Sequence, residues 1–237
     1  MTSSPMPSDA LHDILTRAQH LLFDFDGPIC DVYAGLPPAT VADRLRKLIT
    51  GSSIQIPDGV ARSADPLEVF AYAASIDPEL AARVEAELTE QEHAAVATAK
   101  PAAYVHEVVT ACRESGRSVA VVSNNSDRAV RAYLTRHGLD DRVDLVVART
   151  SHDAALLKPH PHLIETALTA LGAEPGACAF VGDSTTDIEA ARHAGVPSIG
   201  YANRPGKNAS LAEAGADAVV GSLADLVLVL RARPLPN

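Results

Sequence analysis

Positively charged residues are scarce in this chain: 20 lysines and arginines stand against 30 aspartates and glutamates, a net charge of −10. Proteins that bind nucleic acids without sequence preference need a lysine and arginine footprint, so this balance argues against a nucleic-acid partner. A small anionic ligand is compatible with the charge, provided that a metal ion or local cations reverse the field at its site.

Long apolar runs are missing as well. No run approaches the roughly 20 consecutive residues that a membrane-spanning helix needs, and residues 1–10 lack the basic start and apolar centre of a secretory signal. Cys30, Cys112 and Cys178 are widely spaced, which is typical of buried thiols in a reducing compartment rather than of a disulfide framework. These absences predict a cytoplasmic protein without a membrane partner.

The apolar residues that are present lie in short blocks. They make up 47% of the 237 residues, which excludes a disordered chain, and a chain of this length can form one large domain or a core domain with a smaller insert. Six blocks predict strands that are mostly buried on both faces. They span residues 21–25, 118–123, 143–147, 178–182, 198–201 and 218–220.

Helical patterns alternate with these strands. A glycine follows each pattern closely, as expected of a helix C-terminal cap. The patterns span residues 104–115, 127–137, 162–171 and 188–193. This alternation predicts an α/β fold, a Rossmann-like parallel sheet with helices on both faces, and in such sheets ligands bind beyond the carboxyl ends of the strands.

One stretch, residues 35–99, breaks the alternation because it contains no convincing strand. Two apolar stripes predict helices there, and residues 66–75 could form a shorter one. The stripes are Val41, Leu45, Leu48 and Ile49, and Leu80, Val84 and Leu88. We therefore expect a discontinuous core domain, residues 9–34 and 101–237, with an inserted helical domain, residues 35–100. Its linkers would be the proline-containing segments 36–38 and 100–101.

Two aspartates, Asp24 and Asp26, stand one residue apart at the end of the first apolar run. Alternate side chains of a strand share a face, so both carboxylates are expected to point the same way. At 4 Å and an effective dielectric constant near 20, two such charges repel each other by about 4 kcal/mol. A divalent cation, a lysine or a shared proton is the usual compensation, so we expect the centre of an active site here.

Three further blocks place polar side chains at the borders of the predicted elements. The second strand ends in Ser123 and Asn124, Lys158 precedes a helix start, and Asp183 and Asp187 follow the fourth strand, four residues apart at the start of a helix. Because the carboxyl ends of parallel strands meet at one edge, we expect Ser123 and Asp183 near the aspartate pair.

In order and spacing, the blocks 24–27, 121–125, 157–159 and 181–187 resemble the haloacid dehalogenase superfamily. The match is to its phosphoglycolate-phosphatase-like phosphatase branch, which carries a helical cap after the first strand. The resemblance covers nearly the whole chain. It implies the fold of that superfamily, a Mg²⁺ cofactor, a small phosphorylated metabolite as substrate, an aspartyl-phosphate intermediate, and a monomer or homodimer.

The resemblance also implies catalytic roles for single residues. Asp24 would be the nucleophile that becomes phosphorylated, and Asp26 the general acid that protonates the leaving oxygen and later activates water. Ser123 would hold phosphoryl oxygens, and Lys158 would neutralise charge on Asp24 and the phosphate. One position departs from the family pattern: Pro28 stands where threonine is frequent, and it has no amide proton to donate to a phosphate.

The implied ligands of Mg²⁺ are oxygens, which that ion prefers: the carboxylates of Asp24 and Asp183 and the main-chain carbonyl of Asp26. Asp187 would be either an outer metal ligand or a residue that orients Lys158. The residues implied to bind the substrate are Gly27, Ser123, Asn124 and Lys158.

Other functions share these motifs. A phosphosugar mutase keeps both aspartates, and a binding or regulatory protein could keep the fold without catalysis, whereas the dehalogenase branch does not keep the second one, Asp26. His160 and His162 lack a third spaced ligand, which favours surface or packing roles over a transition-metal site. In this family the cap selects the substrate, so we expect the loop 52–59 to meet its organic part. Residues 203–207 would lie either at the rim of the site or in solvent.

Overall fold

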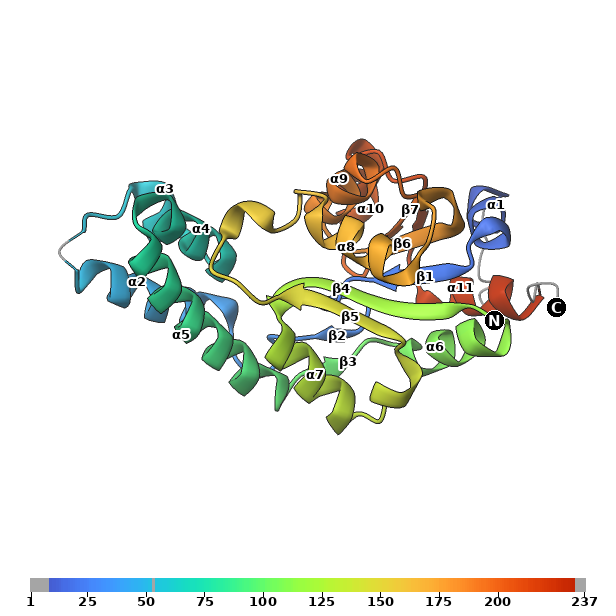
Figure 1. The fold of residues 1–237 in the computed structure, drawn as a ribbon, viewed down its shortest axis with the longest axis horizontal. Helices are drawn as coiled ribbons and strands as arrows, with labels where there is room; N and C mark the ends of the chain where they lie inside the picture. Colours follow the sequence, from blue (N-terminus) through green and yellow to red (C-terminus); the bar gives the residue numbers. More distant parts are fainter. Residues whose placement is uncertain (1–8, 53, 233–237) are drawn as a thin grey trace.

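Six parallel strands form one sheet in the order β5-β4-β1-β6-β7-β8 (Figure 1). The computed structural model describes residues 9–52 and 54–232, so the expectation about the first ten residues falls mostly outside the described part. The strands are β1 (His20–Phe23), β4 (Ser118–Ser126), β5 (Leu145–Arg149), β6 (Cys178–Gly182), β7 (Ser198–Tyr201) and β8 (Ala218–Val220). The predicted α/β fold with a Rossmann-like parallel sheet is confirmed.

Three of these strands have the predicted bounds, and the other three differ for local reasons. β1 ends at Phe23, two residues earlier than predicted, because the chain turns and the Gly27 amide donates to the Cys30 carbonyl. β5 begins two residues later than predicted, because the Asp144 carboxylate takes the place of a main-chain carbonyl and accepts a 2.8 Å hydrogen bond from the Val119 amide. β4 continues three residues further than predicted.

Alternate strand residues face two different helical layers, one on each face of the sheet. Leu21 and Phe23 pack with α1, α6, α7 and α11, whereas Leu22 packs with α8 and α9. The helices of the core are α1 (Asp9–Arg17), α6 (Val105–Glu114), α7 (Asp127–Arg136), α8 (His162–Leu171), α9 (Thr185–His193), α10 (Lys207–Glu213) and α11 (Leu223–Ala232). Short 3₁₀ turns are η1 (Asp140–Arg142), η2 (Ala154–Leu156) and η3 (Pro175–Ala177). The helical patterns of the sequence analysis predict none of the helices α1, α10 and α11.

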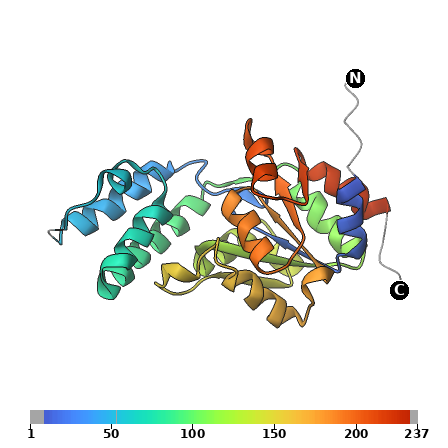
Figure 2. The ribbon, with the colours of Figure 1, turned by 90° about the horizontal axis from the view of Figure 1, so that it is seen from above.

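Four helices between β2 and β3 form a lobe beside the sheet (Figure 2), called the helical insert below. They are α2 (Pro38–Thr50), α3 (Asp58–Arg62), α4 (Pro66–Ile76) and α5 (Pro78–Val96). The lobe buries its own apolar cluster, which includes Leu45, Phe70 and Val84. Leu48 does not belong to the buried stripe as predicted, because it lies at the edge of the face that Leu45 and Ile49 bury and is 37% exposed. The domain boundaries at 35 and 100 stay a prediction.

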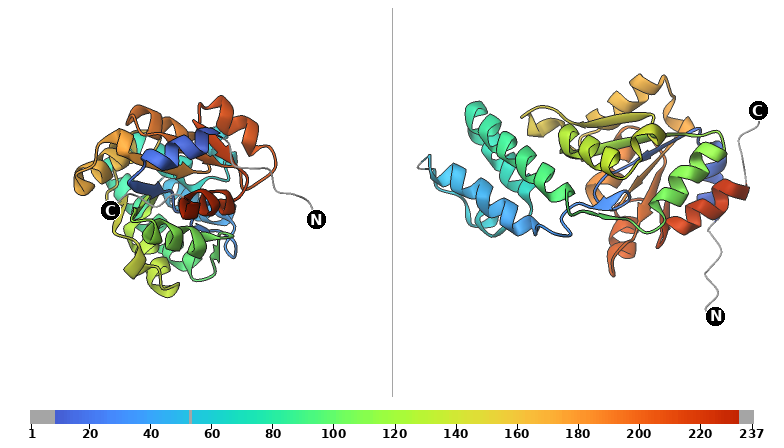
Figure 3. Two further views of the ribbon diagram at one scale, coloured as in Figure 1. Left: turned by 90° about the vertical axis from the view of Figure 1, so that its right-hand side faces the viewer. Right: turned by 90° about the horizontal axis from the view of Figure 1, so that it is seen from below.

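A two-stranded antiparallel ribbon joins the entry and exit of the helical insert. It pairs β2 (Cys30–Asp31) with β3 (Lys100–Pro101), and the two connections run side by side in the right-hand view of Figure 3. The sequence analysis treats residues 100–101 as a linker, because two-residue strands carry no periodicity that a sequence can reveal. The ribbon restrains the exit of the insert against its entry.

Two expectations drawn from composition can be compared with the structure. The three cysteines are free and buried, which confirms their expected packing role. Within residues 9–52 and 54–232, none of the helices combines the length and apolar character that crossing a membrane requires.

Replacing Leu45 by alanine should lower the free energy of unfolding by about 2–5 kcal/mol, because the buried side chain leaves a cavity in the insert. Leu48→Ala on the same helix is the matched control, and its effect should stay within about 0.5 kcal/mol because the side chain is partly exposed. Urea unfolding curves measure both values. Equal losses would contradict the assignment of the buried face.

Candidate active site

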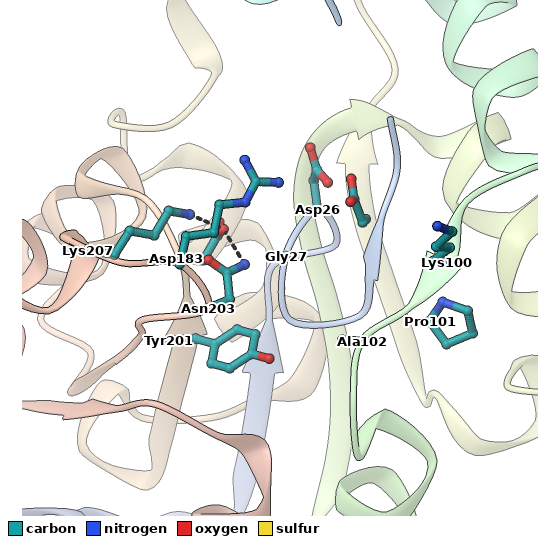
Figure 4. A pocket seen from close by; sticks show the side chains of 11 residues that line it. Asp26, Gly27, Lys100, Pro101, Ala102, Asp183, Tyr201, Asn203 and Lys207 are labelled. Atoms are coloured by element: carbon teal, nitrogen blue, oxygen red, sulfur yellow. Dashed lines mark hydrogen bonds and ion pairs between the residues drawn. The ribbon is translucent and has the colours of Figure 1, made fainter. Parts of the chain in front are cut away.

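The carboxyl ends of the strands open onto a cavity of about 660 Å³, lined by the sheet on one side and the helical insert on the other. The structure therefore brings together groups that are far apart in the chain. Seven predicted site residues line this cavity: Asp24, Asp26, Ser123, Asn124, Lys158, Asp183 and Asp187. Gly27 lines an adjoining cavity of about 470 Å³, which shares Asp26 and Asp183 with the first (Figure 4).

Lys158 occupies the centre of the charge arrangement. Its Nζ donates to Asp24 Oδ1 at 2.8 Å, to Asp187 Oδ1 at 2.6 Å and to the Val122 carbonyl at 3.2 Å, and its side chain is 2% exposed. Burial acts to lower the pKa of this ammonium, but the carboxylates of Asp187 and Asp24 raise it above its usual value. Lys158 therefore keeps its charge at any working pH.

Asp187 uses both carboxylate oxygens within the protein. Oδ1 accepts from Lys158, and Oδ2 accepts from the amides of Asp183 and Ser184 at 3.1 Å each, while Ser184 Oγ caps the helix by accepting from the Asp187 amide. Gly182 makes room for this side chain, since a Cβ there would lie 2.4 Å from the Cβ of Asp187. These contacts favour orientation of Lys158 over direct metal ligation, the two roles that the sequence leaves open.

The two carboxyls after β1 have raised pKa values. Burial and the neighbouring Asp187 raise the pKa of Asp24 to about 8, against the opposing effect of Lys158. Burial raises the pKa of Asp26 to about 7, although its carboxylate accepts a 3.0 Å hydrogen bond from the Val32 amide. Negative charge at this site is therefore undercompensated by the protein alone.

The Ser123 hydroxyl is held in place by Asn125. It accepts from the Asn125 amide at 3.1 Å and lies 3.2 Å from Asn125 Oδ1. The side chain of Asn124, an expected substrate contact, hydrogen-bonds to the backbone of Lys158 instead. Its Oδ1 accepts from the Lys158 amide at 2.9 Å, and its Nδ2 donates to the Lys158 carbonyl at 3.1 Å. The Asn124 amide group thus fixes the backbone of the lysine, and substrate binding by Asn124 stays a prediction.

Residues 203–207 reach the site. The sequence analysis leaves open whether they lie at its rim or in solvent. Asn203 Nδ2 donates to Asp183 Oδ2 at 2.9 Å, and the Lys207 ammonium forms an ion pair with the same oxygen (Figure 4). Burial raises the pKa of Asp183, and these two partners act to lower it. Asp183 also lies against the backbone of Gly27, where a Cβ would come within 2.3 Å of its Cγ.

The acidic groups fit a hard divalent cation. One carboxylate oxygen each of Asp24, Asp183 and Asp187 lie within 4.8 Å of one another, and carboxylate and carbonyl oxygens are the ligands that Mg²⁺ prefers. The raised pKa values of Asp24 and Asp183 mark the charge that such an ion would compensate. Because both carboxylate oxygens of Asp187 already accept hydrogen bonds within the protein, Asp24 and Asp183 are the side chains best suited to hold the ion.

The helical insert contributes a segment that the sequence analysis misses. The first residues of α4 and the two before it, called the turn 64–67 below, line the cavity with Ala64, Asp65, Pro66 and Leu67. Asp65 fixes this turn by accepting a 2.8 Å hydrogen bond from the Leu67 amide. The described residues of the loop 52–59 lie between α2 and α3, at the end of the insert far from the sheet (Figure 1). The sequence signal for this turn is Asp65-Pro66, since proline is frequent at the first position of a helix.

Comparison with known proteins places most of the chain in one family. Residues 21–201 match the family model described as haloacid dehalogenase-like hydrolase. The phosphoglycolate phosphatase of Vibrio vulnificus is 29% identical over 89% of this chain and 95% of that protein. A match of 35% identity to the pyrophosphatase PpaX of Halalkalibacterium halodurans covers 42% of this chain and spans only about half of that relative, 46% of its length.

Solved structures share the architecture. The crystal structure of a predicted phosphatase from Clostridium acetobutylicum superposes with a TM-score of 0.70 at 20% identity, and the match covers 89% of this chain and 97% of the other. At that identity the likeness concerns the fold.

Gly27→Ala should destabilise the protein by about 1–3 kcal/mol, because Gly27 has φ +114° and an added Cβ would overlap the Asp183 carboxylate. Gly221→Ala is the control, because a Cβ at Gly221 meets nothing within 4 Å and its effect should stay within about 0.5 kcal/mol. Thermal unfolding of the two variants measures the difference. An unaffected Gly27→Ala protein would show that Asp183 does not need this close approach.

Proposed function

The chain belongs to the haloacid dehalogenase-like hydrolase family, and from this membership we propose that it is a Mg²⁺-dependent phosphatase that hydrolyses a small phosphorylated metabolite through an aspartyl-phosphate. Phosphatase relatives support the hydrolase class along nearly the full chain. The single observation that carries the proposal is the Lys158 ammonium, which lies between Asp24 and Asp187 in a cavity that also holds Asp26 and Asp183. Phosphoryl transfer depends mainly on such positioning and charge neutralisation.

In the first step, an Asp24 carboxylate oxygen attacks phosphorus, and the bond from phosphorus to the leaving oxygen breaks. The leaving oxygen takes the proton of Asp26, whose pKa of about 7 keeps a protonated fraction at neutral pH. Lys158 and the Ser123 hydroxyl stabilise the charge on the phosphoryl oxygens. Lys158 contributes without changing its protonation state, because both of its carboxylate partners hold the proton on it.

In the second step, the Asp26 carboxylate accepts a proton from a water molecule that attacks the phosphorus of the aspartyl-phosphate. The bond between phosphorus and Asp24 breaks, which releases inorganic phosphate and restores both carboxyl groups. A Mg²⁺ ion held by the Asp24 and Asp183 carboxylates and the Asp26 main-chain carbonyl would supply positive charge to the phosphoryl group.

We further propose that the helical insert acts as a cap that selects the substrate. Its lining of the cavity consists of the turn 64–67 and Pro38 at the start of α2, and the described residues of the loop 52–59 are not part of it. This turn offers an acid, Asp65, and an apolar side chain, Leu67, to the organic part of a substrate. A panel of phosphorylated metabolites with Mg²⁺ would identify that substrate, and release of inorganic phosphate rather than an isomerised product would separate a phosphatase from a phosphosugar mutase.

Asp24→Asn should abolish release of phosphate from a generic phosphate ester, because the amide keeps the shape of the side chain but cannot act as the nucleophile. Excess chelator should abolish the activity of the unmodified protein, and added Mg²⁺ should restore it. Phosphate release measured by a colorimetric assay checks both. Undiminished turnover by the variant, or in chelator, would sink the mechanism.

Asp26→Asn should lower kcat/KM for alkyl phosphates by about 10²–10⁴, and much less for nitrophenyl phosphates, whose leaving groups need no proton. With Mg²⁺ keeping Asp24 ionised, the acid form of Asp26 is the one that limits the reaction, so kcat/KM for alkyl phosphates should fall as pH rises through the pKa of Asp26, which burial raises to about 7. The variant should lack this decline. An equal penalty for both substrate types would argue against the general-acid role.

A further inference from the structure

A carboxylate of the helical insert lies buried in the core at a point that the mechanism above does not use. Glu92 on α5 is 0% exposed, and it forms a two-pronged ion pair with Arg149 at the end of β5, with distances of 2.9 Å to Nη2 and 3.2 Å to Nη1. Glu85, seven residues before Glu92 on α5, accepts a hydrogen bond from Arg149 Nε at 3.1 Å. The guanidinium also lies 5.6 Å from the ring centroid of Phe70 on α4.

The same pair holds the backbone at the C-terminal end of β4, residues 123–126, called the loop 123–126 below because its pairing with β5 is irregular. Glu92 Oε2 accepts from the Ser126 amide at 2.8 Å, Glu92 Oε1 accepts from Asn125 Nδ2 at 3.1 Å, and Arg149 Nη1 donates to the Asn124 carbonyl at 2.8 Å. The carboxylate therefore receives charge-assisted hydrogen bonds from the loop and from the arginine at once. Such bonds, shielded from water, fix the geometry of the groups that make them.

This loop carries the groups that meet the phosphate. Asn125, whose side chain is held by Glu92, positions the Ser123 hydroxyl through its main-chain amide. Asn124, whose main-chain carbonyl is held by Arg149, fixes the backbone of Lys158 through its side chain. One continuous buried network therefore runs from a helix of the insert to the serine and the lysine of the site.

We propose that Glu92 and Arg149 are positioning residues: the insert, through Glu92, completes the loop 123–126 that holds the phosphoryl group. The assignment of a phosphoryl group to this loop rests on the proposed function. The insert then has a part in binding the phosphate itself, in addition to any part in choosing the organic portion. A misplacement of catalytic groups by about 1 Å can cost 10²-fold in rate.

The test replaces both partners at once. Removing one partner would leave an uncompensated buried charge and lower the free energy of unfolding by about 3–5 kcal/mol, whereas replacing both by apolar residues of similar volume is often neutral for stability. Glu92→Met/Arg149→Met should therefore fold but lose the bonds to the loop. We expect kcat/KM to fall at least about 10²-fold, the inhibition constant of inorganic phosphate to rise at least tenfold, and the amides of 124–126 to exchange hydrogen faster. The Mg²⁺ dissociation constant should change less than threefold, because the side chains of Asp24 and Asp183 bond to Lys158, Asn203 and Lys207 and not to the loop 123–126.

A second pair provides the matched control. Glu90 and Arg128 also join α5 to the core, at α7, but both side chains are more than half exposed, and they hydrogen-bond to each other rather than to the loop 123–126. Glu90→Gln/Arg128→Gln should leave phosphate inhibition, hydrogen exchange at 124–126 and kcat/KM within twofold. A similar loss in this control would overturn the proposal, because it would assign the effect to the attachment of the insert in general.

The proposal is also overturned if the folded double methionine variant keeps its phosphate inhibition constant within twofold. Should that variant not fold, Glu92→Gln and Asn125→Ala decide, each compared with Glu90→Gln. Both variants should weaken the binding of inorganic phosphate and accelerate hydrogen exchange of the amides of 124–126. If both variants kept the unmodified protein's phosphate inhibition constant and exchange rates, the network would be refuted. If the unmodified protein neither hydrolyses phosphate esters nor binds inorganic phosphate, the proposed function fails, and hydrogen exchange still decides whether Glu92 and Arg149 order the loop.

Discussion

Burying a lysine ammonium costs several kcal/mol unless carboxylates and other acceptors surround it, and Lys158 meets this condition with two carboxylates and one carbonyl. Much of the surrounding structure serves that arrangement. Gly182 has no side chain so that Asp187 can turn inward, and the start of α9 satisfies the second oxygen of Asp187. Because Asn124 ties down the lysine backbone, the ammonium is fixed from both ends.

The site resolves an apparent conflict between an acidic chain and an anionic substrate. Lys158 and Lys207 carry positive charge into the cavities, but both are already paired with carboxylates. The remaining basic residues are Arg204, which lines both cavities, and Lys100, which lines the smaller one, and both are exposed. A phosphate dianion therefore needs positive charge beyond these side chains, and a divalent cation between Asp24 and Asp183 is the form of charge that the oxygen donors suit.

Local patterns made most of the core predictable. Strands, helix ends and the short blocks around Asp24, Ser123, Lys158 and Asp183 each depend on neighbours within a few residues, so a single sequence carries their signal. The pair of Glu92 and Arg149 depends on residues 57 positions apart, and neither residue belongs to a motif. The same limit hid the β2–β3 ribbon. The contact segment of the insert was misplaced because the orientation of its helices follows from tertiary packing, which periodicity does not encode.

The buried pair also bears on how such a protein can diverge. Inserts of this kind invite the view that a cap is a module which recombination can exchange between relatives. Here an exchanged insert lacking carboxylates at the positions of Glu85 and Glu92 would leave the Arg149 guanidinium buried and unpaired, a penalty of about 3–5 kcal/mol. Point changes in the turn 64–67 touch the cavity without touching the pair. New specificities in this lineage are therefore more accessible by substitution at that turn than by transplantation of the whole insert.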